Sequence, residues 1–153
     1  MKLRLEIDPD RPEEVVIYSH SVDERVRRLQ EAFGRELATA GELALKNGDE
    51  ELYIPHSEIL FFETADNRVW AHTAADCYSS ALRLTELEEL LPRTFARASK
   101  GCIINTAAVR SLKRSPAGVA AAGFSGSAKV VYVSRMYYKN VRDIIEETRL
   151  NRK

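Results

Sequence analysis

Alternation of apolar and polar residues dominates the chain between residues 41 and 133, and a period of two is typical of half-buried strands. The predicted strands cover residues 42–47, 50–55, 57–66, 68–74, 76–82, 102–105, 109–113, 118–124 and 129–133. Asn47-Gly48 and Asp66-Asn67 lie between consecutive strands and predict tight hairpin turns. Because the strands mostly follow one another without alternating helices, the sequence predicts a mainly β (α+β) fold.

Helical periodicity occurs in three segments. The first follows Ser21, which forms a capping-box pattern with Glu24. Its apolar residues share one face: Val22, Val26, Leu29, Phe33 and Leu37. The second starts at Thr85, which repeats the capping pattern with Glu88, and it stops at Pro92.

The third helical segment begins after Ser134, the expected N-cap, and places an apolar and a basic face on opposite sides. The apolar face holds Tyr137, Val141, Ile144 and Thr148, and the basic face holds Arg135, Lys139 and Arg142. Arg135 occupies the first helical position, where the helix dipole disfavours a cation by about 0.3–1 kcal/mol. Such a position suits a phosphate or a guanine edge. The alternative is an ion pair with a carboxylate of the acidic middle segment.

Residues 1–40 form a separate pattern. Leu3, Leu5 and Ile7 alternate with charged residues and predict a strand, and residues 13–20 predict a second one. With the first helix they make a strand-strand-helix extension, followed from Gly41 by a domain that reaches residue 148. The expected exposed strand edge and the apolar helix face motivate the hypothesis that this extension forms a homodimer.

The total charge is zero, but it is unevenly distributed. Residues 41–91 hold 3 basic and 11 acidic side chains (net −8), whereas residues 92–153 hold 13 and 3 (net +10). Residues 97–116 contain no acidic residue and five basic ones: Arg97, Lys100, Arg110, Lys113 and Arg114. This split indicates a polyanionic partner for the basic part, or an acidic–basic contact inside the fold.

Several classes of protein are disfavoured. No apolar run approaches the roughly 20 residues that span a bilayer, and the N-terminus lacks the apolar core of a secretion signal, so a cytoplasmic location is expected. Cys77 and Cys102 are expected to be free thiols. The chain has no metal-binding motif, phosphate loop or nucleophile elbow. We therefore expect neither an enzyme nor a metal, cofactor or small-molecule substrate.

Four motifs occur in a specific order: the strand SEILFFE, the helix LTELEELL, the segment FARASKGCIIN and the closing VSRMYY. In order and spacing they resemble the LytTR family of bacterial DNA-binding domains, over roughly residues 42–146. The resemblance implies an elongated arrangement of short antiparallel strands, with one inserted helix and a C-terminal helix. It also implies a transcriptional regulator that reads double-stranded DNA through loops.

The family's reading side chains correspond here to Asn67 and Arg68, to Ser99 and Lys100, and to Arg135. Charge and position add further basic residues, so the predicted DNA-binding set is Asn67, Arg68, Arg97, Ser99, Lys100, Lys113, Arg114, Arg135 and Lys139. Forty residues are too few for a receiver domain, so the chain resembles small stand-alone LytTR regulators. By family analogy a co-encoded membrane protein could control it.

Two other functions are compatible with the charge pattern. An RNA or single-strand binder would need exposed aromatic residues beside basic ones on a β-surface, whereas Phe61, Phe62 and Trp70 lie in apolar surroundings. A protein-interaction module would use the acidic and basic segments to bind a partner. The four motifs favour the DNA-binding interpretation over both.

Overall fold

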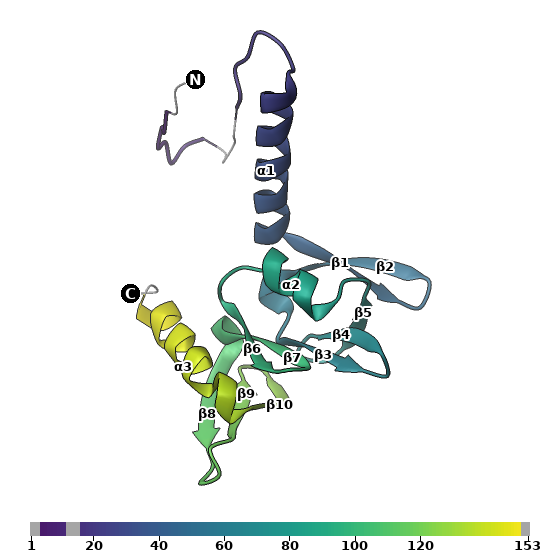
Figure 1. Ribbon diagram of the computed structural model, residues 1–153, viewed down its shortest axis with the longest axis vertical. Coiled ribbons are helices and arrows are strands. Elements are labelled where there is room, and N and C mark those ends of the chain that lie inside the picture. Colours follow the sequence, from purple (N-terminus) through teal and green to yellow (C-terminus); the bar gives the residue numbers. More distant parts are fainter. Residues whose placement is uncertain (1–3, 12–15, 151–153) are drawn as a thin grey trace. The chain divides into compact units, whose positions relative to one another are not determined.

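The computed structural model describes residues 4–11 and 16–150, without the side chains of residues 34–40, and the chain divides into two compact units, residues 1–34 and 35–153. The elements in chain order (Figure 1) are α1 (Glu24–Ala40), β1 (Glu42–Asn47), β2 (Glu50–Pro55), η1 (His56–Glu58), β3 (Phe61–Ala65), β4 (Arg68–His72), β5 (Cys77–Ser80), α2 (Leu84–Leu90), β6 (Phe95–Ser99), β7 (Cys102–Asn105), η2 (Thr106–Ala108), β8 (Val109–Arg114), β9 (Ala120–Phe124), β10 (Ser127–Val133) and α3 (Arg135–Leu150). The predicted mainly β fold is confirmed.

The second unit contains two antiparallel sheets. The larger has seven strands in the order β2-β1-β5-β4-β3-β7-β6, and the smaller has three in the order β10-β9-β8. β6 is therefore an edge strand, and α3 packs beside it. Short strands with one exposed face account for most of the alternating sequence pattern, whereas β7 is buried at all four of its positions.

Two cores hold the second unit together. One buries Leu84 and Leu87 of α2 against the β1–β5 part of the large sheet and Ile103 of β7. The other buries Val141 and Ile145 of α3 among residues of β6 to β10. The predicted apolar face of α3 is thus confirmed, with Ile145 as an additional buried member.

The predicted strands of the N-terminal extension are not present in the part of it that the structure describes, residues 4–11 and 16–23. Leu5 is 83% exposed and Ile7 is 87% exposed; Leu3 and residues 13–15 lie outside the described residues. Alternation is only a local preference, and a strand also needs a partner for its backbone hydrogen bonds, which a lone short segment lacks. The extension's helix, α1, is confirmed.

Both predicted capping boxes are wrong by one or more residues. α1 is capped by Asp23, whose Oδ1 accepts a hydrogen bond from the Val26 backbone N–H at 2.9 Å, so Ser21 lies before the helix. Asp is as good a cap as Ser and adds favourable charge at the helix N-terminus. α2 begins at Leu84 rather than after Thr85, because Leu84 is drawn into the core.

Two differences concern the strands. The β1–β2 turn consists of Gly48-Asp49 rather than Asn47-Gly48, because Leu45 pairs with Leu52 and Asn47 with Glu50. β6 was not predicted, since its buried residues are Ala96 and Ala98, which contribute little to an apolar pattern. β6 ends at Ser99 and leads into a turn of Lys100 and Gly101 before β7.

Candidate nucleic-acid interface

The β6–β7 turn and the beginning of α3 meet at one hollow. The Ser134 backbone N–H donates to the Ala98 carbonyl at 2.8 Å, which ties the start of α3 to the end of β6. The hollow has a volume of about 430 Å³, and it is lined by Ser99, Lys100, Ser134, Arg135, Met136 and Tyr137. We call it the α3 hollow. Two predicted positions that are 35 residues apart in sequence, Lys100 and Arg135, therefore share one surface.

The β3–β4 turn lies at the same end of the large sheet. The Thr64 backbone N–H donates to the Gly101 carbonyl at 2.9 Å, so the end of β3 touches the β6–β7 turn. Asp66 and Asn67, the turn residues, have φ values of +52° and +60°. Asn67 and Arg68 are both exposed. Asn67 therefore follows by three positions a residue that is bonded to the β6–β7 turn.

Arg135 is exposed, and its aliphatic stem rests on Gly118 in the β8–β9 turn. A Cβ on Gly118 would stand 2.6 Å from Arg135 Cδ, and Gly118 has φ of +89°, so glycine is needed there for two reasons. Among the described residues no carboxylate forms an ion pair with Arg135. The alternative prediction, in which an acidic residue neutralises Arg135, is wrong for the described part of the chain.

Arg97 differs from Arg135 in being bound within the protein. Its Nε lies 2.8 Å from Glu88 Oε1, and its Nη1 donates to the Lys100 carbonyl. Only 15% of its side chain is exposed. The guanidinium thus links Glu88 of α2 to the backbone of the β6–β7 turn.

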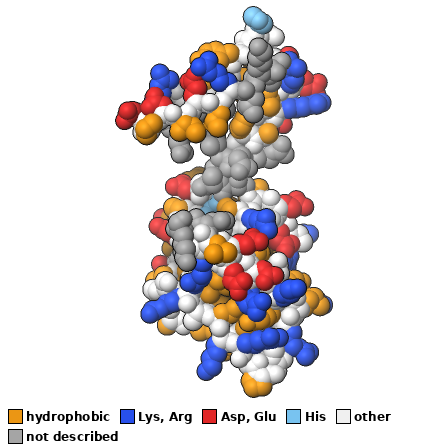
Figure 2. All heavy atoms as spheres, turned by 90° about the vertical axis from the view of Figure 1, so that its left-hand side faces the viewer, with side chains coloured by type: hydrophobic (Ala, Val, Ile, Leu, Met, Phe, Trp, Pro, Cys, Tyr) orange, Lys and Arg blue, Asp and Glu red, His pale blue; other side chains and the backbone are white. Residues whose placement is uncertain are grey.

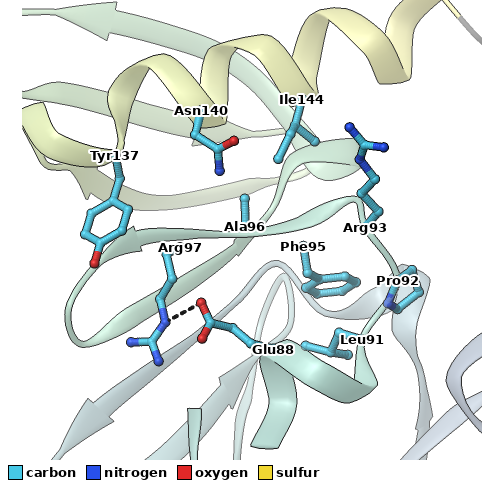
Figure 3. Close-up of a pocket in the computed structure, with 10 residues that line it drawn as sticks. All are labelled: Glu88, Leu91, Pro92, Arg93, Phe95, Ala96, Arg97, Tyr137, Asn140 and Ile144. Atoms are coloured by element: carbon cyan, nitrogen blue, oxygen red, sulfur yellow. Dashed lines mark ion pairs between the residues drawn. The ribbon is translucent and has the colours of Figure 1, made fainter. Parts of the chain in front are cut away.

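A groove runs along β6 between α2 and α3 (Figure 3), with a volume of about 380 Å³. Tyr137, Asn140 and Ile144 project into it from α3, and the Arg97–Glu88 pair closes one side. We call it the β6 groove. Tyr137 lines both the β6 groove and the α3 hollow, so the two depressions are neighbours.

The other predicted basic residues lie on the small sheet and on α3. Lys113 is exposed on β8, opposite Ala121 of β9. The Arg114 guanidinium stacks over the Tyr138 ring at 4.5 Å, which orients it beside the start of α3. Lys139 is exposed one turn along α3 from Arg135. Figure 2 shows Lys and Arg side chains gathered towards the lower end of the second unit, with Asp and Glu side chains above them.

Two histidines of the second unit lie in different surroundings, one with hydrogen-bond partners and one without. His72 Nε2 lies 2.8 Å from Glu63 Oε1 and its Nδ1 lies 3.2 Å from Lys129 Nζ, which joins the two sheets. Burial lowers the pKa of His72, an effect that Glu63 opposes and Lys129 adds to. Burial also lowers the pKa of His56, whose ring nitrogens have no hydrogen-bond partner.

The two cysteines are free thiols, as expected. Burial raises the pKa of the Cys102 thiol to about 12, so it stays protonated and unreactive at neutral pH. No cluster of potential metal ligands exists among the described residues. In the same part of the chain, every helix is too short or too polar to cross a bilayer.

Sequence reasoning did not identify Met136, Gly118 and Tyr138 as parts of this surface. Gly118 and Tyr138 position Arg135 and Arg114 through contacts across the fold, which no local pattern reveals. Met136 could have been noticed, because it stands directly beside Arg135 on the side of α3 away from Val141.

Comparison with known proteins bears on this surface. The family model of the LytTr DNA-binding domain matches residues 49–146. Two Staphylococcus aureus proteins described as uncharacterized HTH-type transcriptional regulators are 33% and 31% identical over 96 residues, which is 62% of this chain and 65% of theirs. A solved LytTr DNA-binding domain from Bacillus cereus has a TM-score of 0.63 at 21% identity, covering 69% of this chain and 96% of that domain.

Proposed function

Because the chain belongs to the LytTr DNA-binding domain family, we propose that it is a transcriptional regulator that binds specific sequences in double-stranded DNA through its loops. The observation that carries this proposal is the meeting of Lys100 and Arg135 at the α3 hollow, with no carboxylate paired to either among the described residues. Exposed cations without partners can bind phosphates without first breaking an ion pair in the protein. Their binding also releases counterions from the DNA.

The side chains divide into three roles. Arg135 projects from the start of α3 and Asn67 from the β3–β4 turn. They read base edges, since Arg binds guanine and Asn binds adenine, each through two hydrogen bonds. Lys100, Lys113, Arg114, Arg68 and Lys139 bind phosphates and set the register. Arg97 supports Lys100 through the carbonyl it holds, so its role is to position the turn.

A single-strand or RNA binder is less well supported. Such a protein stacks bases on exposed aromatic rings along a basic β-surface. Phe61 and Phe62 are buried, and the Trp70 indole donates to the Ala65 carbonyl at 3.2 Å. Tyr53 is exposed, but it lies on β2 beside Glu51, where the charge repels nucleic acid. On the small sheet, Tyr132 of β10 is exposed in the same cross-strand row as Lys113, but it is the one exposed aromatic ring of the three strands, whereas stacking of successive bases needs several.

Selection from genomic DNA tests the function. The purified protein is mixed with sheared genomic fragments at 50 mM and at 200 mM salt, values that span the range where non-specific binding weakens by about 10³-fold or more. We expect a few fragments with a shared short motif to survive the higher salt. Equal binding of all fragments at low salt, with no binding at high salt, would show that the surface binds polyanions without sequence specificity.

We also propose that residues 1–40 form a homodimer. Among the described residues of this region, five large apolar side chains are more than half exposed: Leu5, Ile7, Val16, Tyr18 and Val22. Exposed apolar groups at this density are typical of a surface that binds another protein. A second copy would supply the strand partner that the alternating segments lack. No feature of the described residues bears on the co-encoded membrane protein, which stays a prediction.

Multi-angle light scattering across a hundredfold range of concentration tests the dimer. We expect the mass to approach that of two chains, and the double substitution Leu5→Asp and Ile7→Asp to shift it towards one. Exposed Lys46 in β1 offers a control, since Lys46→Asp should leave the mass unchanged. A monomer mass at every concentration would refute the proposal.

A further inference from the structure

Met136 is an exposed apolar side chain beside two exposed cations. It is the second residue of α3 and is 76% exposed, and it belongs to neither of the two cores. It lines the α3 hollow together with Lys100 and Arg135. Folding gains nothing from an exposed methionine here, and a polar residue would keep the surface better hydrated.

The α3 hollow combines two chemical properties. Its rim carries the exposed cations Lys100 and Arg135, whereas its lining is mostly apolar, because Met136, Tyr137 and the stems of the long side chains form it. A ligand that fits both the basic rim and the apolar lining must carry negative charge at its periphery and an apolar group where it enters the hollow. A phosphate alone satisfies only the first condition.

Among the groups that base pairs present in the major groove, the thymine C5-methyl is the largest apolar one. We propose that Met136 contacts a thymine methyl group and makes DNA binding depend on that methyl. Guanine and adenine would place hydrogen-bonding atoms against the thioether, and these atoms would lose water without gaining a partner. Cytosine would present only a hydrogen at C5 and would leave the space of the methyl group unfilled. Met136 would therefore favour thymine at one position of the recognised sequence. This inference rests on the proposed function.

Replacement of thymine by deoxyuridine tests the contact, since it removes only the methyl group. A bound sequence from the genomic selection is resynthesised with one such replacement at a time on both strands. Affinity is then measured by fluorescence anisotropy at constant salt. For wild-type protein we expect one or more replacements to weaken binding about fourfold, the factor for one buried methyl-sized group.

Three variants connect this loss to Met136. For Met136→Ala the same replacement should have no effect, because the apolar partner is gone, while Met136→Leu should keep the methyl dependence. Tyr132→Ala is the matched control: Tyr132 is 68% exposed but does not line the hollow, so the dependence should persist. Met136 and Tyr132 are exposed, so unfolding temperatures should match the wild type.

Two results would overturn the inference while leaving the proposed function intact. One is specific binding in which no thymine methyl matters to the wild type. The other is equal methyl dependence in wild type and Met136→Ala. If the selection yields no specific fragment at all, the proposed function fails first and the inference fails with it.

Discussion

The β6 groove and the α3 hollow lie on either side of Tyr137 and have similar volumes, about 380 and 430 Å³, but their arginines differ. In the groove, Arg97 is paired with Glu88 and bonded to the Lys100 carbonyl. In the hollow, Arg135 rests on Gly118 and is paired with no carboxylate of the described residues. Basic residues of one charged segment thus serve two purposes: some hold the fold, and others stay available for an anion.

Of the substitutions that test this difference between the two arginines, Arg135→Ala should have the largest effect on DNA affinity. Loss of a two-bond contact to a base should cost about 1–3 kcal/mol of specific binding and much less of non-specific binding. Anisotropy titrations with the selected sequence and with a scrambled duplex measure both. Equal losses on the two DNAs would make Arg135 a phosphate contact.

Gly118→Ala should displace Arg135 by changing the residue on which its side chain rests. The added Cβ would meet Arg135 Cδ at 2.6 Å, and the backbone φ of +89° is strained for alanine, so both specific affinity and stability should fall. Gly126→Ala is a matched control for stability, because it also has positive φ (+74°) but open space around it. It should lose stability without losing specificity. Equal loss of specificity in both variants would argue against support of Arg135 by Gly118.

Arg97→Ala should mainly damage the fold. It removes the ion pair with Glu88 and the hydrogen bond that the largely buried guanidinium donates to the Lys100 carbonyl. We therefore expect the free energy of unfolding to fall by about 1–2 kcal/mol, as measured by urea denaturation. Binding of specific and scrambled DNA should weaken together, because the Lys100 turn loosens. Unchanged stability with a large loss of binding would instead indicate that Arg97 contacts DNA directly.

Lys129 is a second basic residue that serves the fold, through His72 and the Asp76 carbonyl. The pKa values of His72 and His56 are lowered from 6.5 in the folded protein. As the pH falls, these two histidines are therefore protonated in the unfolded chain at a higher pH than in the folded protein. Stability should therefore be constant above pH 6.5 as far as these groups are concerned, and should fall as the pH drops below it. Thermal unfolding between pH 5 and 8 measures this, and His72→Gln should reduce the fall. A rise in stability towards pH 5 would contradict the prediction.

The smallest effect should come from Lys113→Ala. A phosphate contact on an exposed strand should weaken specific and non-specific binding alike, and should reduce the slope of log K against log salt by about 0.9. Affinities at four salt concentrations measure the slope. An unchanged slope would place Lys113 outside the interface.

The sequence by itself determined the elements whose signals are local. The hairpin at Asp66-Asn67, most strands and the amphipathic α3 follow from side-chain periodicity and turn chemistry, which depend only on neighbouring residues. The motifs also indicate the family, and the position of Arg135 at a helix start predicts an anionic partner for it.

Only the tertiary structure decided which cations are paired. Arg97 and Arg135 look equally available in the sequence, and the difference depends on Glu88 and Gly118, which approach them through the fold. β6 likewise is a strand because it pairs with β7, and its own sequence does not predict it. The alternating N-terminal segments have no such partner and form no strand in their described part. The physical reason is common to all three cases: ion pairs and strand hydrogen bonds require a second group brought close in space, and local sequence specifies only one of the two.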